Sequence, residues 1–219
     1  MSVNAELLGA EIGGYVLERR LGTGASATVY LARDGGGNPV AFKLLAPGAD
    51  LGQRDGDARE RLRSEALALK RVHVPGVAAV MDLEVDGVDA FIVTEYVPGP
   101  TLAEDVRVSG AWQLEDALEL GTMLAATLRA VHESGICHRD IKPANVILGP
   151  NGPVLIDFGI SSVLENTSGL TRTGLVVGTP GFISPEVIEG QKADFADDWW
   201  ALAALLLFTL TGRPPFGTG

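Results

Sequence analysis

The chain has 219 residues, which is enough for one large domain or two small ones. Hydrophobic residues make up 46% of it, so the composition excludes a chain that is disordered throughout. The net charge is −11 and no basic block is present, which excludes nucleic acid as an expected partner. This acidity mildly favours basic peptide substrates, although solubility is the simpler explanation.

The single cysteine, Cys137, predicts a chain without internal disulfides and a reducing, cytoplasmic location. Its neighbours Ile136 and Ile141 indicate a buried loop, in which the thiol is a small apolar group and not a nucleophile. The N-terminus has no basic stretch, so no signal peptide is expected. The longest apolar run, residues 201–210, is too short to span a membrane and is typical of a buried helix.

The first half of the chain is predicted to be rich in β-strands. Residues 1–12 form a lead-in, and a charged helix is expected at about residues 57–72. Strands bounded by glycine-rich turns are predicted at residues 15–17, 28–32, 40–45, 77–83 and 88–96. Pro98-Gly99-Pro100 is the expected boundary between two lobes, at residues 13–97 and 98–219.

The second half is predicted to be mainly helical. Apolar residues recur with helical period from Leu114 to Val131, and this long helix is expected to stop near Gly135. Two short strands follow, at residues 146–148 and 154–156, and then a polar segment at residues 161–173. Two further helices are expected at residues 185–189 and 196–211. A β-rich lobe followed by a helical one predicts the α+β fold class.

The most informative pattern combines Asp140, Asn145 and Asp157. Asn145 follows Asp140 by five positions, and Asp157 follows Asp140 by 17. Phosphoryl transfer requires one carboxylate that receives the attacking hydroxyl, and an amide and a second carboxylate that hold Mg²⁺ on the nucleotide phosphates. In this order and at this spacing, the three side chains predict that reaction.

The motifs His138-Arg139-Asp140 through Asn145 and Asp157-Phe158-Gly159 resemble those of the bacterial Hanks-type serine/threonine protein kinases. The resemblance covers about residues 15–216. It implies a two-lobe kinase fold, ATP with Mg²⁺ (or Mn²⁺) as cofactors, and protein substrates with Ser/Thr acceptors. It also implies that Lys142 neutralises the γ-phosphate and sets serine/threonine specificity, and that Asn145 and Asp157 bind the metal.

A second group of motifs resembles the nucleotide site of the same family. Lys43 ends a Val-Ala-Phe-Lys strand, which implies contact with the α- and β-phosphates. The glycine-rich loop corresponds to Gly22, Thr23, Gly24, Ala25, Ser26, Ala27, Thr28 and Val29, with Ala27 in place of the third glycine. The resemblance places adenine between four side chains, Leu21, Val29, Ala41 and Ile147. It also implies that adenine bonds to the backbone near Glu95 and Val97, and that Thr94 lines the back of the pocket.

The helix predicted at residues 57–72 offers a carboxylate for Lys43. Stepping about 100° per residue places Glu65 within the apolar stripe of Ala66 and Leu69, and Glu60 on the opposite face. An acid on a buried face is costly unless it is paired. Glu65 is therefore the predicted partner of Lys43.

The segment before Glu186 resembles the activation segment of the family. Thr179 is expected to bond near Asp140 and Lys142, and Ser184 replaces alanine in the family's Ala-Pro-Glu motif. The same resemblance implies Thr171 and Thr173 as autophosphorylation sites, and a phosphate on this segment could pair with Arg139 and order it. Asp198 resembles the family aspartate that accepts N–H groups of the catalytic loop.

Three alternatives remain open at this level: a pseudokinase that only binds, a small-molecule phosphotransferase, and a folded but inactive kinase fragment. Kinase domains continue past the position of Phe216 with several more helices, and full-length members are often membrane-anchored. The helix at residues 196–211 is apolar all round. With the chain ending at Gly219, we expect that helix to lack covering layers and to promote self-association or a homodimer.

Overall fold

The structure is a computed structural model and describes residues 7–24, 27–45, 70, 73–84, 89–158 and 181–217. The chain divides into two compact units. The first comprises residues 1–71 and 78–96, and the second comprises residues 72–77 and 97–219.

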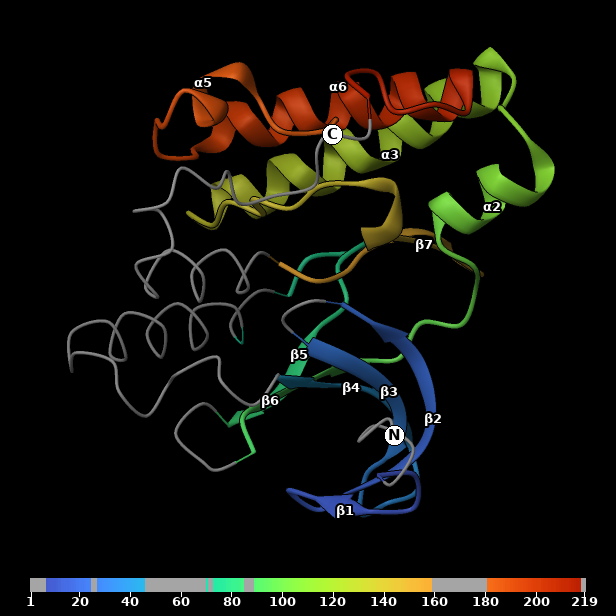
Figure 1. The fold of residues 1–219 in the computed structure, drawn as a ribbon, viewed down its shortest axis with the longest axis vertical. Helices are drawn as coiled ribbons and strands as arrows, with labels where there is room; N and C mark the ends of the chain where they lie inside the picture. The colour runs from blue at the N-terminus through green and yellow to red at the C-terminus, as the bar shows by residue number, and fades with distance from the viewer. Residues whose placement is uncertain are drawn as a thin grey trace. The chain divides into compact units, whose positions relative to one another are not determined.

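In the described part of the first unit, six antiparallel strands form one sheet in the order β1-β2-β3-β4-β6-β5 (Figure 1). Their bounds are Glu11–Ile12, Tyr15–Thr23, Ala27–Arg33, Pro39–Leu45, Val80–Glu84 and Phe91–Glu95 for β1 to β6. Side chains alternate between two faces along a strand. In β4, Val40 and Phe42 are fully buried. Ala41 and Lys43, which alternate with them and point to the other face, are half-buried.

The fully buried face carries the apolar core of this unit. Its members are Leu17, Tyr30, Ala32, Val40, Phe42, Phe91 and Val93. Phe42 and Phe91 stack at its centre with their ring centroids 4.8 Å apart. Burying large aromatic side chains contributes strongly to stability, so this face of the sheet forms the core of the unit.

The second unit is helical, with one two-stranded hairpin. Its helices are α2 (Leu102–Ser109), α3 (Leu114–Glu133), the 3₁₀ turn η2 (Pro143–Asn145), α5 (Pro185–Ile188) and α6 (Phe195–Thr211), and its hairpin is β7 (Val146–Gly149) with β8 (Gly152–Leu155). Figure 1 shows α3 and α6 lying side by side, and Leu124, Leu128, Leu202 and Leu205 are buried in their shared core. Both α2 and α6 begin with a capping box, formed by Thr101 with Glu104 and by Asp194 with Asp197.

The α+β class agrees with the prediction, and several element boundaries differ from it. The strand expected from Val77 begins at Val80, because Val77 instead forms a bridge with Leu155 and Gly76 accepts a bond from the same residue. Helix α2 was not predicted, although its capping box is visible in the sequence. Glu11 and Ile12, expected in the lead-in, pair with β2. The helix expected at residues 57–72 lies outside the described residues, apart from Lys70.

Candidate functional site

The predicted nucleotide-binding side chains of the first unit share one face of the sheet. Val29 lies opposite Lys43 across β3 and β4, and Ala41 lies opposite Thr94 across β4 and β6. All four are half-buried, whereas the residues that alternate with them form the core. The strand register therefore gathers a lysine, a threonine and two small apolar side chains on one surface, as the predicted role requires.

The turn between β2 and β3 carries the glycines of the predicted phosphate loop. A Cβ on Gly22 would meet no described atom within 4 Å, and one on Gly24 would meet only the Ala27 carbonyl at 3.7 Å. Neither glycine has a positive φ. The local packing therefore does not require glycine at either position, which fits a loop whose backbone must approach a ligand closely. Ala27, in place of the third glycine, is buried, and Ala25 and Ser26 lie outside the described residues.

Glu65, the predicted partner of Lys43, also lies outside the described residues, so that ion pair stays a prediction. The chain leaves the first unit after Tyr96. Glu95, the last residue of β6, donates its backbone N–H to the Ala79 carbonyl. Leu21, predicted to border adenine, is 38% exposed.

Val97 and Ile147, the two residues of the second unit that were predicted to contact adenine, lie along one edge of the hairpin. Thr101 forms an antiparallel bridge with Ile147, and the Leu148 N–H donates to the Pro100 carbonyl. The stretch from Val97 therefore runs beside β7. Val97 itself is buried.

Asp140 is held by two residues of its own loop. Lys142 Nζ donates to Asp140 Oδ2 at 2.8 Å, and Asn145 Nδ2 donates to the same oxygen at 2.8 Å. The Asn145 amide also donates to the Asp140 backbone carbonyl at 2.8 Å. One carboxylate oxygen is thus anchored by a cation and an amide, and the orientation of the other is fixed with it.

The hairpin β7–β8 brings Asp157 close to Asn145 in space. Val146 pairs with Leu155, and just beyond this pair the Ile156 N–H donates to the Asn145 carbonyl at 2.9 Å. Asp157 is the next residue along the chain. Asn145 and Asp157, which are 12 positions apart in the sequence, therefore lie at the same end of the hairpin.

Backbone strain marks the same two loops. Arg139 has φ = 64° and Asp157 has φ = 57°, and they are the two non-glycine residues with positive φ in the described part of the chain. Such a conformation costs about 1–3 kcal/mol and persists only where the surroundings impose it. Strain at the arginine of the first motif and at the aspartate of the second indicates function at both.

His138 is a structural residue and not an acid or base. Its ring is fully buried and packs on Phe158 at a centroid distance of 4.5 Å. Burial lowers the pKa of His138, so the ring is neutral. In the matching tautomer, Nε2–H donates to the Ile156 carbonyl at 3.2 Å, and Nδ1 accepts the Asp140 N–H at 3.3 Å. A neutral ring thus ties the Asp140 loop to the strand before Asp157.

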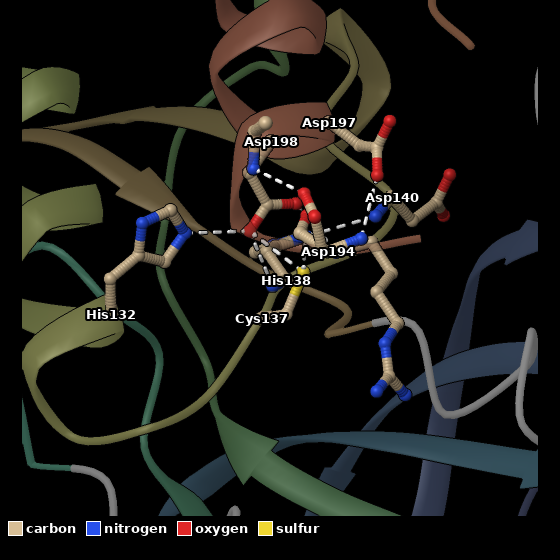
Figure 2. A network of polar contacts seen from close by, with 9 residues as sticks. His132, Cys137, His138, Asp140, Asp194, Asp197 and Asp198 are labelled. Atoms are coloured by element: carbon tan, nitrogen blue, oxygen red, sulfur yellow. Dashed lines mark hydrogen bonds and ion pairs between the residues drawn. The ribbon is translucent and has the colours of Figure 1, made fainter. Parts of the chain in front are cut away.

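Asp198, at the start of α6, accepts backbone N–H groups of the loop that precedes Asp140, as predicted. Its buried carboxylate accepts the backbone N–H groups of His138 at 2.7 Å and Arg139 at 2.8 Å. The carboxylate is 1% exposed and also accepts His132 Nε2 of α3 at 2.8 Å (Figure 2). The role of His132 was missed because its partner lies 66 positions away.

The Cys137 thiol belongs to the same hydrogen-bond network, and its environment disfavours the reactive thiolate. It donates to the Asp194 carbonyl at 3.1 Å and to Asp198 Oδ2 at 3.3 Å (Figure 2). Burial, with the nearby Asp198 charge, raises the pKa of the Cys137 thiol to about 12. The thiolate is the nucleophilic form, so the expectation of an unreactive cysteine fits this environment.

Ser184, in place of the family alanine, joins α5 to α6. Its hydroxyl donates to Asp197 Oδ1, and it accepts the Val187 N–H at the start of α5. Glu186 is exposed. Thr171, Thr173 and Thr179 lie outside the described residues.

The described residues contain no cluster of three or more His, Cys, Asp or Glu side chains that could hold a metal by itself. A site built from one amide and one carboxylate needs further oxygens from its ligand. No helix in the described part of the chain is long and apolar enough to cross a membrane.

Comparison with known proteins agrees with this geometry. Residues 15–219 match the family described as "Protein kinase domain". The probable serine/threonine-protein kinase PkwA of Thermomonospora curvata is 37% identical over 205 residues, which cover 94% of this chain and 27% of that protein. The chain spans between 25% and 50% of the length of the curated relatives it matches.

Solved structures give the same result. The crystal structure of the Mycobacterium tuberculosis PknI kinase domain is 27% identical, with a TM-score of 0.77 over 97% of this chain and 80% of that chain. The crystal structure of Rad53 residues 1–466 in complex with AMP-PNP is 25% identical, with a TM-score of 0.73 over 92% of this chain and 49% of that chain. The predicted two-lobe kinase fold is thereby confirmed.

Proposed function

Since the chain belongs to the protein kinase domain family, we propose that it is the catalytic domain of a serine/threonine kinase. It transfers the γ-phosphate of ATP to hydroxyl groups of protein substrates. The observation that carries this proposal is the environment of Asp140, in which one oxygen is anchored by Lys142 and Asn145. A pseudokinase that had lost transfer would have no need of that arrangement.

Asp140 acts on the acceptor hydroxyl. Because Oδ2 is occupied by Lys142 and Asn145, Oδ1 is the oxygen that receives the proton or orients the hydroxyl. Lys142 lies against the same carboxylate and neutralises charge on the transferred phosphate. Lys142 thus acts on Asp140, which receives the hydroxyl proton, and on the phosphate that is transferred.

Asn145 and Asp157 are the residues that would hold Mg²⁺. The nitrogen of the Asn145 amide donates to Asp140, so its oxygen is the atom that can face a cation. Mg²⁺ prefers oxygen ligands and keeps further positions for phosphate oxygens and water. When bound, the ion neutralises charge on the β- and γ-phosphates. Mn²⁺ has similar ligand preferences and is the alternative.

We assign the nucleotide contacts residue by residue from the family resemblance. Lys43 contacts the α- and β-phosphates, with Glu65 as its ion-pair partner. The backbone of the loop from Gly22 to Val29 closes over the phosphates. Leu21, Ala41 and Ile147 enclose adenine, while Thr94, Glu95 and Val97 line its edge. The solved structure of the similar Rad53 is a complex with AMP-PNP, which supports ATP as the phosphate donor.

Serine and threonine side chains of proteins are the proposed acceptors. The curated relatives are named serine/threonine-protein kinases, and Lys142 after the catalytic aspartate is typical of that specificity. We also propose autophosphorylation at Thr171 or Thr173, since a phosphate there can pair with Arg139 and order the segment. The lobes are proposed at residues 13–97 and 98–219, and the domain in the cytoplasm.

The decisive experiment separates transfer from nucleotide binding. We expect the wild-type chain to transfer labelled phosphate from ATP to a generic basic protein, and to bind ATP more tightly with Mg²⁺ than with EDTA. Asp140→Asn should abolish transfer and leave ATP affinity within about twofold, because the side chain acts on the hydroxyl. Asn145→Ala should instead weaken binding only when Mg²⁺ is present. Equal ATP affinity with Mg²⁺ and EDTA, or parallel loss of binding and transfer in Asp140→Asn, would contradict the proposal.

A further inference from the structure

The short segment formed by residues 181–184 is fastened to α6 and to the turn that follows this helix. Phe182 is buried, and its ring meets the ring of Phe208 on α6 edge-on, with the centroids 6.2 Å apart. Gly181 has φ = 94°, and a Cβ there would lie 2.8 Å from the carbonyl oxygen of Gly217. Close packing of this kind leaves little freedom for the backbone. The segment is therefore held in place before any ligand binds.

Ser184 supplies the polar contact between this segment and α6. It is 2% exposed, and its hydroxyl donates to Asp197 Oδ1 while it accepts the Val187 N–H at 3.3 Å. The second oxygen of Asp197 accepts the Asp194 N–H at 2.6 Å, so both carboxylate oxygens are engaged. Hydrogen bonds to charged groups are the stronger ones. An alanine at position 184 would leave an oxygen of the half-buried Asp197 without this donor.

The acceptor of the Ser184 hydroxyl lies directly beside the residue that holds the catalytic loop. Asp197 and Asp198 are consecutive residues in the first turn of α6 (Figure 2). Asp198 accepts the backbone N–H groups of the two residues that precede Asp140. Consecutive Cα atoms are only about 3.8 Å apart. A single helical turn thus sets the position of residues 181–184 relative to the loop that carries Asp140.

We propose that Ser184 is a positioning residue for the protein substrate, an inference that rests on the proposed kinase function. An extended polypeptide spans about 3.3–3.6 Å per residue, so a substrate whose hydroxyl lies at Asp140 also reaches residues 181–184. Ser184 keeps that surface in place through Asp197 and takes no part in the binding of ATP. Without its hydroxyl, fewer molecules have the segment in place, and the apparent affinity for the substrate falls by the same fraction.

Steady-state kinetics on the whole 219-residue chain test this role. The probe is the serine or threonine peptide that the wild-type chain phosphorylates best in a positional-scanning library with labelled ATP. Ser184→Ala should raise the KM for this peptide about fivefold or more. The KM for ATP and kcat should change by less than about twofold, because a surface that binds the substrate and the transition state equally contributes to KM alone.

Hydrolysis of ATP without peptide gives a readout that a purely structural defect would also lower. Water replaces the peptide as acceptor of the γ-phosphate there, and it needs no contact with residues 181–184. We expect the hydrolysis rate of Ser184→Ala to stay within about twofold of the wild-type rate. The matched control is Ser134→Ala, an exposed serine whose hydroxyl donates to the Ala130 carbonyl of α3 at 3.1 Å. This control should leave the peptide KM unchanged.

The link through Asp197 is tested by a double-variant cycle. Asp197→Ala removes the acceptor from the other side and should raise the peptide KM as well. The double variant with Ser184→Ala should then have the peptide KM of Asp197→Ala alone, because the two residues act through one hydrogen bond. Urea denaturation of each variant gives the folded fraction by which its rates are corrected.

Three results would overturn the inference. They are an unchanged peptide KM in Ser184→Ala, a parallel loss of peptide transfer and ATP hydrolysis, and multiplicative effects of the two substitutions on the peptide KM. A wild-type chain that phosphorylates no peptide of the library would instead refute the proposed function, and this inference with it. Transfer by the wild type together with an unaltered Ser184→Ala variant refutes this inference alone.

Discussion

Replacing Asp198 tests whether one buried carboxylate supports the geometry of the catalytic loop. Asp198→Ala leaves the N–H groups of His138 and Arg139 without their acceptor at a buried position. A hydrogen bond to a charged group contributes about 1.5–3 kcal/mol. Losing two of them should lower the free energy of unfolding by about 3–6 kcal/mol, against about 5–15 kcal/mol for a typical domain.

The isosteric variant Asp198→Asn separates hydrogen bonding from packing. The amide of Asn keeps one acceptor oxygen, but its NH₂ group faces one of the two backbone N–H groups and cannot accept from it. One hydrogen bond is therefore lost, and we expect the free energy of unfolding to fall by about 1.5–3 kcal/mol. The exposed control Glu133→Ala should change stability by less than about 0.5 kcal/mol. Urea denaturation gives the free energies. Phosphate transfer should fall in the same order as stability, since the strained Arg139 backbone loses its restraint.

The reasoning would be refuted by an Asp198→Ala variant that unfolds within about 1 kcal/mol of the control. The link between Asp198 and catalysis would also be refuted if Asp198→Ala were strongly destabilised while its transfer rate per folded molecule stayed unchanged. Stability would then depend on Asp198 without the catalytic loop depending on it. A smaller loss in Asp198→Asn than in Asp198→Ala is required by the hydrogen-bond argument.

Four further outcomes follow from the same structure. Because burial lowers the pKa of His138, the free energy of unfolding should fall as pH drops below about 6.5, where the unfolded histidine gains a proton; urea melts of His138→Asn should be flatter over that range. With a thiol pKa of about 12, native Cys137 should react with iodoacetamide far more slowly at pH 8 than in urea, and equal rates by mass spectrometry would contradict this. Incubation with ATP should place phosphate on Thr171 or Thr173, and mass spectra with phosphate only outside residues 161–179 would reject that. Leu207 is 46% exposed on α6, so Leu207→Lys should reduce self-association in light scattering, and an unchanged mass distribution would exclude this face.

The grouping of Asp140, Lys142 and Asn145 was predictable because the three residues are close together in the sequence. Asp140, Lys142 and Asn145 lie within six residues, and their mutual hydrogen bonds need only the turn that Pro143 begins. Asp198 was predictable by resemblance, and its bonds to the His138 and Arg139 backbone are those expected. Local spacing and motif order were sufficient for these residues.

Contacts that depend on packing between distant segments could not be predicted in this way. His132 meets Asp198 because α3 and α6 pack side by side, and no spacing along the chain encodes that contact. The strand at Val77 was placed too early because its alternation cannot reveal that Val77 belongs to the second unit and forms a bridge with Leu155 there. The approach of Gly152 to Met123 likewise depends on the hairpin packing against α3.

The register of the short hairpin β7–β8 determines which residues lie at each of its ends. Its register fixes Val146 opposite Leu155, and this places Asn145 and Ile156 at one end with Asp157 directly after them. At the other end Gly149 pairs with Gly152, and the turn lies between them. Antiparallel pairing transmits a shift of register along the whole ladder. A change of register at this turn would therefore displace Asn145 relative to Asp157, and metal-dependent nucleotide binding is expected to weaken with it.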